Sequence, residues 1–410
     1  MMTAVSRARR ADAGYSRPIS PTERGYLAGA LVTPPMAIQV CVEGQGGVTA
    51  EELRRAVAAA SDACPGARLV KRGNRWVDSG IAPPVVEADG TALDRRAFDT
   101  PGSELLSRPF TPVKGPNCEA LLLSGDPATI VFRAFHAVMD GKGVMTWAQE
   151  VFRALRGEQP VGAPSVETET GFIKRFGTSA AAPGPAPGCR SPFDRLPAAP
   201  EGDYAAAPGV PWLWRRRTVE GNHNALVART AAAMCALMPQ EDCRFMVPVN
   251  IRRHDPSVAS TANLSLPLFV DVPAGGDRAQ IQGLLLRAMF ERQELSSAGA
   301  FPVTSSGMAP TLGAARATRE HRAAYPCTLV ISDLGKVDLD ALSGGGFTAA
   351  TAYSLPMHVP YAPAFLTVYQ PPGRTEISLS CRNEPDMGAK ADALLDLIEE
   401  ELTGPPTRTG

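Results

Sequence analysis

The amino-acid sequence predicts an α+β fold made of two lobes with mixed or antiparallel sheets. Its 410 residues exceed the usual size of one domain. Strand-like and helix-like segments occur in both halves without the regular alternation of a parallel α/β sheet. A stretch rich in Pro, Gly and Ala around 180–200 separates the halves. We therefore expect a disordered N-terminus at 1–18, a first lobe at 19–160, a crossover linker at 161–210 and a second lobe at 211–410.

The first lobe begins with a strand pattern followed by a helix pattern. Residues 36–43 alternate between apolar and polar side chains, which is typical of a half-buried strand. Thr49 and Glu52 form a capping box that starts a helix, and Pro65 ends it.

Two further strands are predicted at 118–124 and 129–135, and the Gly-Asp-Pro turn between them indicates a hairpin. After Gly141 the apolar spacing becomes that of a helix, with a stripe from Val144 to Leu155. The second lobe mixes both patterns. Helices are expected at 225–238, 280–292 and 389–402, and strands at 244–249, 264–272, 327–331, 364–370 and 375–382.

Composition excludes several classes of function. The net charge of −1 argues against nucleic acid and against acidic membranes as partners. No run of about 18 apolar residues predicts a membrane span, and no apolar stretch follows the basic N-terminus as in a signal peptide. The eight cysteines contain no C-x-x-C pair, which indicates reduced thiols in a cytoplasm rather than disulfides or a metal site.

The most informative stretch is His136-Ala-Val-Met-Asp140-Gly141, where an apolar strand ends and an amphipathic helix begins. The alternation of the strand places His136 on its apolar face. Partial burial lowers the pKa of a histidine and favours the neutral imidazole, which is the form that a general base needs. Asp140 and Gly141 make the turn, and Asp140 can cap the helix. The alternative is a core histidine beside a helix cap, with no chemical role.

The residues Phe135 to Gly141 resemble the H-H-x-x-x-D-G signature of the chloramphenicol-acetyltransferase-like superfamily. That group includes alcohol acyltransferases, wax ester synthases and the condensation domains of peptide synthetases. Five other segments resemble motifs of the same superfamily in the same order: Ile19–Glu23 ("l-s-p-x-E"), Cys64–Val70 ("h-P-x-L-R"), Val247–Arg253 ("v-P-v-d-x-R"), Asn263–Leu268 ("G-N-x-x-x-x-L-P") and Ile331–Gly335 ("S-N-L-G"). Their order and spacing, over most of the chain, carry the resemblance.

The chain departs from this pattern in three places. Phe135 replaces the first histidine, Asp333 replaces the usual asparagine, and the D-F-G-W-G segment of the plant-type branch is absent. No adenylation or carrier module accompanies the motifs, so we expect a stand-alone protein.

The resemblance implies two lobes that meet at a tunnel, with the motif histidine in its middle. His136 would take a proton from the hydroxyl or amine of a small acceptor, which would attack an acyl thioester and expel a thiolate. No nucleophile motif is present, so no covalent enzyme intermediate is expected. The co-substrate would be acyl-CoA or an acyl-phosphopantetheine carrier, with no tightly bound cofactor and no metal.

The resemblance also assigns supporting residues. Asp140 would point away from the tunnel and pair with an arginine. Arg252 and Arg253 are the first candidates and Arg68 is the second.

Stabilisation of the oxyanion would need a hydrogen-bond donor near the thioester carbonyl. The Gly141 N–H is close to the motif in sequence. Ser332 and Ser354 are candidate oxyanion or tunnel residues from the second lobe.

Three hypotheses follow. The first is an acyltransferase of specialised-metabolite biosynthesis. The second is a condensation-type enzyme that forms an amide from a carrier-bound acyl group, and its partner would be an acyl carrier protein. The third is an inactive descendant of the fold that recruits partners. The intact His136 and Asp140 argue against the third, because a recruiting domain needs no base.

Overall fold

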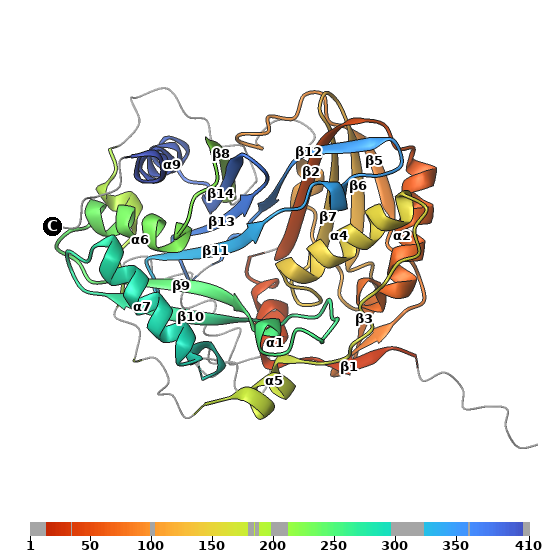
Figure 1. The fold of residues 1–410 in the computed structure, drawn as a ribbon, viewed down its shortest axis with the longest axis horizontal. Helices are drawn as coiled ribbons and strands as arrows, with labels where there is room; N and C mark the ends of the chain where they lie inside the picture. Colours follow the sequence, from red (N-terminus) through yellow and green to blue (C-terminus); the bar gives the residue numbers. More distant parts are fainter. Residues whose placement is uncertain are drawn as a thin grey trace, which may run out of the picture.

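The computed structural model describes residues 14–33, 35–98, 103–178, 184, 188–197, 212–296, 324–359 and 361–404. These residues form two lobes, each with an open mixed sheet that helices cover on one face (Figure 1). The predicted α+β class with two lobes is therefore confirmed. No helix in the described ranges is long and apolar enough to span a membrane.

The sheet of the first lobe has the strand order β12-β2-β7-β6-β5. Its strands are β2 (Ala37–Gly46), β5 (Val85–Asp89), β6 (Cys118–Ser124), β7 (Ala128–Phe135) and β12 (Phe347–Leu355). β6 and β7 pair antiparallel, which confirms the predicted hairpin, while β5 runs parallel to β6. Helices α2 (Ala50–Ala63) and α4 (Gly141–Leu155) pack on one face, where the fully buried Trp147 ring meets Phe132 edge to face.

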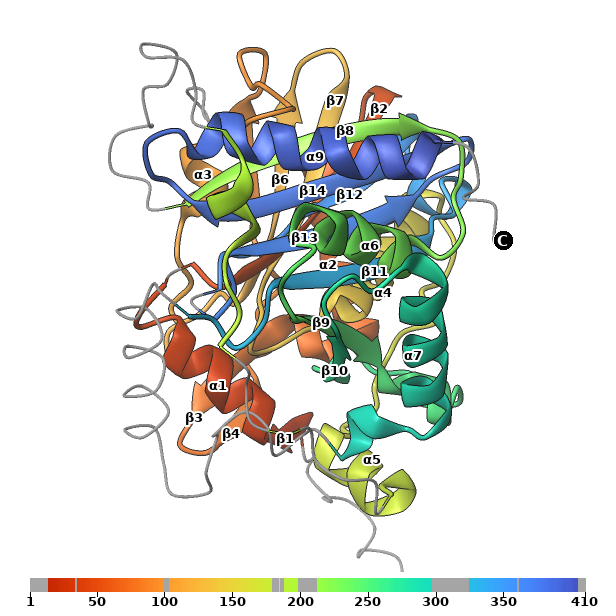
Figure 2. The same cartoon turned by 90° about the vertical axis from the view of Figure 1, so that its left-hand side faces the viewer.

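The sheet of the second lobe has the strand order β10-β9-β11-β13-β14-β8. Its strands are β8 (Trp212–Glu220), β9 (Cys243–Asn250), β10 (Ser265–Val272), β11 (Leu329–Lys336), β13 (Ala364–Gln370) and β14 (Arg374–Arg382). Helices α6 (Leu226–Leu237), α7 (Arg278–Phe290) and α9 (Met387–Thr403) cover one face (Figure 2). From this sheet Met246, Val330 and Phe365 join the apolar core of the first lobe, so the lobes share a buried contact.

One strand crosses between the lobes. β12 follows the second-lobe strand β11 in the chain, yet it pairs with β2 of the first lobe (Figure 1). The crossing requires two glycines in close approach: Gly46 has a φ of +84°, and a Cβ there would lie 2.0 Å from the Gly346 oxygen. A register shift between Ala349 and Thr351 interrupts the pairing. The predicted second lobe at 211–410 therefore contains one strand, β12, that belongs to the sheet of the first lobe.

The N-terminal segment is partly ordered. Residues 1–13 lie outside the described residues, but Ser16–Pro18 form strand β1 and pair with β4 (Arg75–Asp78), which also pairs with β3 (Leu69–Arg72). The expectation of disorder through residue 18 is therefore wrong for this strand. Helix α1 (Pro21–Gly29) follows, with a capping box at Ser20.

The expected crossover linker contains ordered elements. Helix α5 (Glu169–Phe176) and the 3-10 turn η2 (Pro192–Arg195) lie within it, and a bridge from Pro164 to Ser260 ties it to the second lobe. The remaining short elements of the described chain are α3 (Glu104–Ser107), η1 (Pro65–Arg68), η3 (Ile251–His254), η4 (Gln293–Leu295) and η6 (Asp340–Leu342).

All eight cysteines are buried, and none forms a disulfide in this structure. Within the described ranges, no group of three or more His, Cys, Asp or Glu side chains is arranged to hold a metal ion.

Candidate active site

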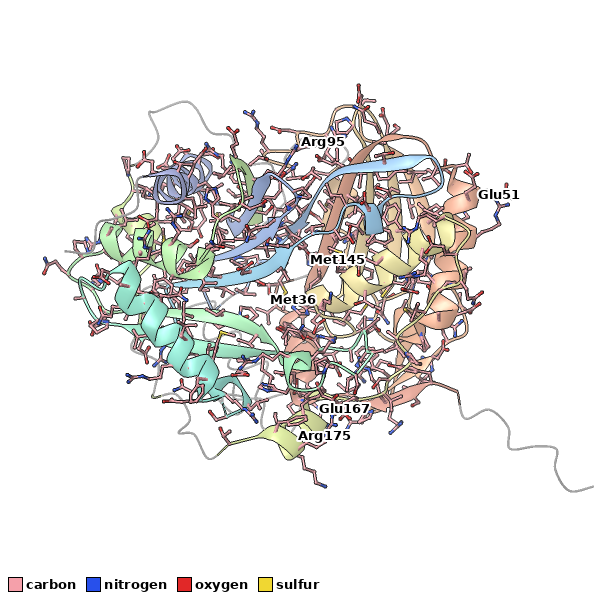
Figure 3. All side chains as sticks on the ribbon, in the orientation of Figure 1. Met36, Glu51, Arg95, Met145, Glu167 and Arg175 are labelled. Carbon is pink, nitrogen blue, oxygen red and sulfur yellow. The ribbon has the colours of Figure 1, made fainter. Side chains whose placement is uncertain are left out.

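The turn from β7 into α4 carries His136. The His136 N–H donates to the Met36 carbonyl at 2.9 Å, which ties the turn to the start of β2. At the other end Asp140 caps α4, since its Oδ1 accepts the Gly143 N–H at 2.7 Å. Met36 and Met145 lie between the two lobes in Figure 3, so this turn is at their junction. His136 itself is 6% exposed.

The nearest polar neighbour of the His136 ring favours one neutral tautomer. Its Nδ1 lies 3.1 Å from the Met139 carbonyl oxygen, which can only accept a hydrogen bond. This shorter contact favours the tautomer with the proton on Nδ1 and the lone pair on Nε2 over the opposite one, which the Asn263 amide nitrogen at 3.3 Å from Nδ1 would favour. Burial lowers the pKa of His136 to about 4, although the charge of Asp140 acts in the opposite direction. The imidazole is thus neutral at pH 7, with Nε2 as its basic atom.

Two residues that the sequence did not single out hold the ring. Tyr26 of α1 stacks on the imidazole, with ring centroids 3.8 Å apart and planes inclined by 14°. The Asn263 amide donates to the His136 carbonyl and lies 3.3 Å from Nδ1. Asn263 belongs to one of the resembling motifs, which could have marked it, but no sequence pattern indicates Tyr26.

Asp140 faces the second lobe. Arg252 of η3 grips its carboxylate with two hydrogen bonds, from Nη1 to Oδ2 at 2.8 Å and from Nη2 to Oδ1 at 3.2 Å. The Leu264 N–H also donates to Oδ2 at 2.8 Å. Both partners of the pair are buried. The carboxylate therefore joins the lobes and makes no hydrogen bond to the imidazole among those of the described residues.

The other two arginines considered lie elsewhere. Arg253 pairs with Glu294 at 2.7 Å, although it is adjacent to Arg252 in sequence. Arg68 pairs with Asp78 at 2.6 Å and also with Asp62. Of the three, the structure brings Arg252 to Asp140.

The junction is tightly packed around the start of α4. A Cβ on Gly143 would lie 2.2 Å from the Thr261 oxygen, so the helix meets the backbone of the second lobe directly. A Cβ on Gly141 would lie 3.0 Å from Leu334 Cδ2, which places β11 over the helix N-terminus. As the first residue of α4, Gly141 has no intrahelical acceptor for its N–H. This N–H is therefore a candidate donor to a developing oxyanion.

Comparisons with known proteins complete this description. No protein-family model matches the sequence, and no curated protein matches it. The starter condensation domain of rhizomide synthetase RzmA, in a product-released conformation of a variant, is 17% identical with a TM-score of 0.61 over 95% of both chains. A variant of that domain in complex with C8-CoA and Leu-SNAC is 16% identical with a TM-score of 0.62 over 94% of both chains. The nonribosomal peptide synthetase FmoA3, bound to AMPPNP, is 16% identical with a TM-score of 0.59 over 97% of this chain and 43% of that chain.

The chain has the condensation-domain fold. This is a chloramphenicol-acetyltransferase-like fold, so the resemblance seen in the sequence is confirmed at the level of the fold.

Within the condensation-domain fold, the two candidate serines differ in their surroundings. The Ser354 hydroxyl on β12 donates to the Gln39 carbonyl at 2.8 Å, so its proton is already engaged. Ser332 is buried on β11, opposite Thr367 of β13. Among the described residues, neither serine makes a hydrogen bond to His136.

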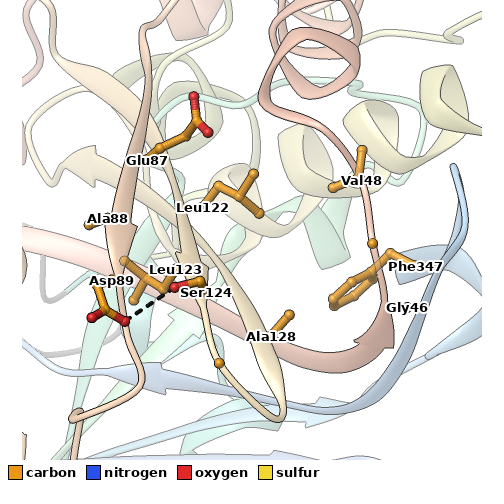
Figure 4. Close-up of a pocket in the computed structure, with 12 residues that line it drawn as sticks. Gly46, Val48, Glu87, Ala88, Asp89, Leu122, Leu123, Ser124, Ala128 and Phe347 are labelled. Atoms are coloured by element: carbon orange, nitrogen blue, oxygen red, sulfur yellow. Dashed lines mark hydrogen bonds between the residues drawn. The ribbon is translucent and has the colours of Figure 1, made fainter.

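A surface hollow of about 530 Å³ lies at the ends of the strands of the first sheet, at the opposite end of β7 from His136 (Figure 4). Its lining includes Glu87, Asp89, Ser124 and Phe347 but no residue of the turn from His136 to Gly141. This hollow is therefore separate from the candidate active site, and the tunnel implied by the resemblance stays a prediction.

Proposed function

We propose that this protein is an acyltransferase that moves an acyl group from a thioester to a hydroxyl or amine of a small molecule, with His136 as general base. The observation that carries the proposal is the placement of His136: it is buried in the turn between β7 and α4 where the lobes meet, its Nδ1 lies 3.1 Å from the Met139 carbonyl, and burial lowers its pKa to about 4, which favours a neutral imidazole with a basic Nε2. The condensation-domain fold supports it, since one protein of that fold was crystallised with C8-CoA and Leu-SNAC.

In the proposed reaction Nε2 accepts the proton of the acceptor as its oxygen or nitrogen attacks the thioester carbonyl. The tetrahedral oxyanion would take a hydrogen bond from the Gly141 N–H, at the positive end of α4. Its collapse breaks the carbon–sulfur bond, and the imidazolium returns its proton to the thiolate. Burial favours this return, because it disfavours the charged form of His136.

The donor would be acyl-CoA or an acylated carrier protein, and the setting would be specialised metabolism in the cytoplasm. A second candidate is amide formation from a carrier-bound donor, which the similarity to a starter condensation domain favours. The third hypothesis, an inactive recruiting domain, gives no reason for a buried, neutral histidine at the junction of the lobes, because such a domain needs no base.

One assay separates these functions. The protein is incubated with C8-CoA or with an octanoylated carrier protein, together with a panel of alcohols and amines, and thiol release is followed. We expect His136→Ala to lower the rate by about 10²- to 10⁴-fold, the usual contribution of a general base. His223→Ala is the matched control, because His223 bonds the Glu220 carbonyl in the turn after β8. Release only from the carrier would favour the second candidate. Unchanged release by His136→Ala would exclude His136 as the base, and no release by the wild type from any donor would favour the third.

A further inference from the structure

A second buried arginine contacts the turn that carries His136. Arg17 of β1 is 1% exposed, and its Nη2 donates to the Val138 carbonyl at 3.0 Å. Its Nη1 pairs with Glu23 Oε1 at 2.5 Å. The hydrogen bond from Arg17 to Val138 joins β1 to the middle of the turn, between residues that are 121 positions apart in the sequence.

The guanidinium is held by a fully buried carboxylate. Glu23 is 0% exposed, and its Oε2 accepts the Ser20 N–H at 2.9 Å and the Trp76 Nε1–H at 3.1 Å. Burying an arginine is costly unless a carboxylate and hydrogen bonds compensate for its lost hydration. Glu23 supplies that compensation, so Arg17 is fixed in place and the Val138 carbonyl meets a rigid donor.

The position of the Val138 carbonyl affects that of the neighbouring Met139 carbonyl, which orients the His136 ring. The Val138 oxygen belongs to the peptide plane that joins Val138 to Met139, and a fixed oxygen fixes that plane. The next carbonyl, that of Met139, is the acceptor for His136 Nδ1 at 3.1 Å. A turn free to rotate at Met139 would lose this bond and the tautomer that it selects.

We propose that Arg17 is a positioning residue for His136. It holds the Val138 carbonyl from the first lobe, while Arg252 holds Asp140 from the second lobe, and together they keep the Met139 carbonyl on Nδ1. This inference rests on the proposed function of His136 as a base. Arg17 lies outside the motif, and we expect it to affect the reaction only by fixing the tautomer of the His136 imidazole.

The test measures the tautomer directly. The ¹⁵N resonances of the histidine rings are recorded at pH 7 in the full chain, and His136 is assigned by its absence in His136→Gln. The principal variant is Arg17→Lys, because an ammonium keeps the charge beside Glu23 but lacks the planar fork that reaches two acceptors at once. Arg17→Met removes both contacts. Arg75→Met is the matched control, since Arg75 donates hydrogen bonds to Ser16, which lies on β1 beside Arg17, but makes no hydrogen bond to the turn that carries His136.

We expect a single Nδ1–H tautomer in the wild type and in Arg75→Met. Arg17→Lys should show a mixture of the two tautomers, with kcat lowered by about 10- to 100-fold, less than the full contribution of a base. KM should stay within about twofold, because Arg17 would contact no substrate. If Arg17→Met does not fold, Arg17→Lys decides the question.

A wild-type tautomer and kcat in folded Arg17→Lys would overturn the proposal. A loss of activity that only follows the folded fraction, with the tautomer unchanged, would do so as well. Failure of the proposed function has a different signature: the tautomer would respond to Arg17, yet His136→Gln would release thiol at the wild-type rate.

Discussion

Replacing Asp140 by asparagine tests the junction of the two lobes. The carboxylate accepts four hydrogen bonds: two from Arg252, one from Leu264 N–H and one from Gly143 N–H. An asparagine has one oxygen, so its NH₂ group must face two donors on one side. It also leaves the buried guanidinium without a counter-charge.

The expected cost follows from these contacts. Removing one partner of a buried ion pair usually costs about 3–5 kcal/mol. Arg252 keeps acceptors in the carbonyls of Ser260 and Ala262, at 3.1 and 2.6 Å, and these retain part of its solvation. We therefore expect Asp140→Asn to lower the free energy of unfolding by about 3 kcal/mol, at the lower end of that range. Against a typical stability of about 5–15 kcal/mol, this loss is large enough to reduce the soluble yield.

The assay is urea unfolding followed by tryptophan fluorescence and circular dichroism, with thiol release measured on the folded fraction. The matched control is Glu51→Gln, which makes the same chemical change in an exposed pair with Arg55, where about 0–1 kcal/mol is expected. A stability of Asp140→Asn within about 1 kcal/mol of the wild type would refute this account of the junction. A variant that is equally stable yet inactive would indicate a direct catalytic role for Asp140.

Two further predictions concern packing and pH. Gly143→Ala should destabilise the protein by about 1–3 kcal/mol, because its Cβ would meet the Thr261 oxygen at 2.2 Å. Gly283→Ala, in an exposed turn of α7 with no atom within 4 Å, should stabilise it by up to about 1 kcal/mol; equal effects of the two in thermal unfolding would contradict the packing argument. The pKa of His136 falls from 6.5 to about 4 on folding, so between these values the unfolded chain binds more protons. Its contribution, about 3 kcal/mol, is complete above pH 6.5 and is lost as the pH falls to about 4. Burial raises the pKa of Glu169 from 4.5 to about 7, so its contribution is complete below pH 4.5 and is lost toward pH 7. Because the two slopes oppose each other, the test is the difference between wild type and His136→Gln in urea titrations at pH 4.5 and 7; a difference that does not change with pH would refute the shift.

Much of the fold was predictable because it is encoded locally. The strands predicted at 118–124 and 129–135 match β6 and β7 closely, because two short apolar segments flank a Gly-Asp-Pro turn signal that is local in the sequence. The stripe from Val144 to Leu155 likewise matches α4. β12 was not predicted, because its Thr- and Ala-rich sequence and its register shift hide the alternation.

The candidate site divides in the same way. The sequence by itself determined that His136 ends an apolar strand, that Asp140 caps a helix and that the histidine is buried enough to be neutral. These features depend on residues that are close together in the sequence, so the spacing of polar and apolar residues is enough to predict them. Only the tertiary structure decided that Arg252 rather than Arg253 meets Asp140, that Tyr26 and Asn263 hold the imidazole, and that Arg17 holds Val138. Those contacts join residues that lie 110 to 127 positions apart in the sequence. Their partners are chosen by how the two lobes pack, which no local pattern of side chains specifies.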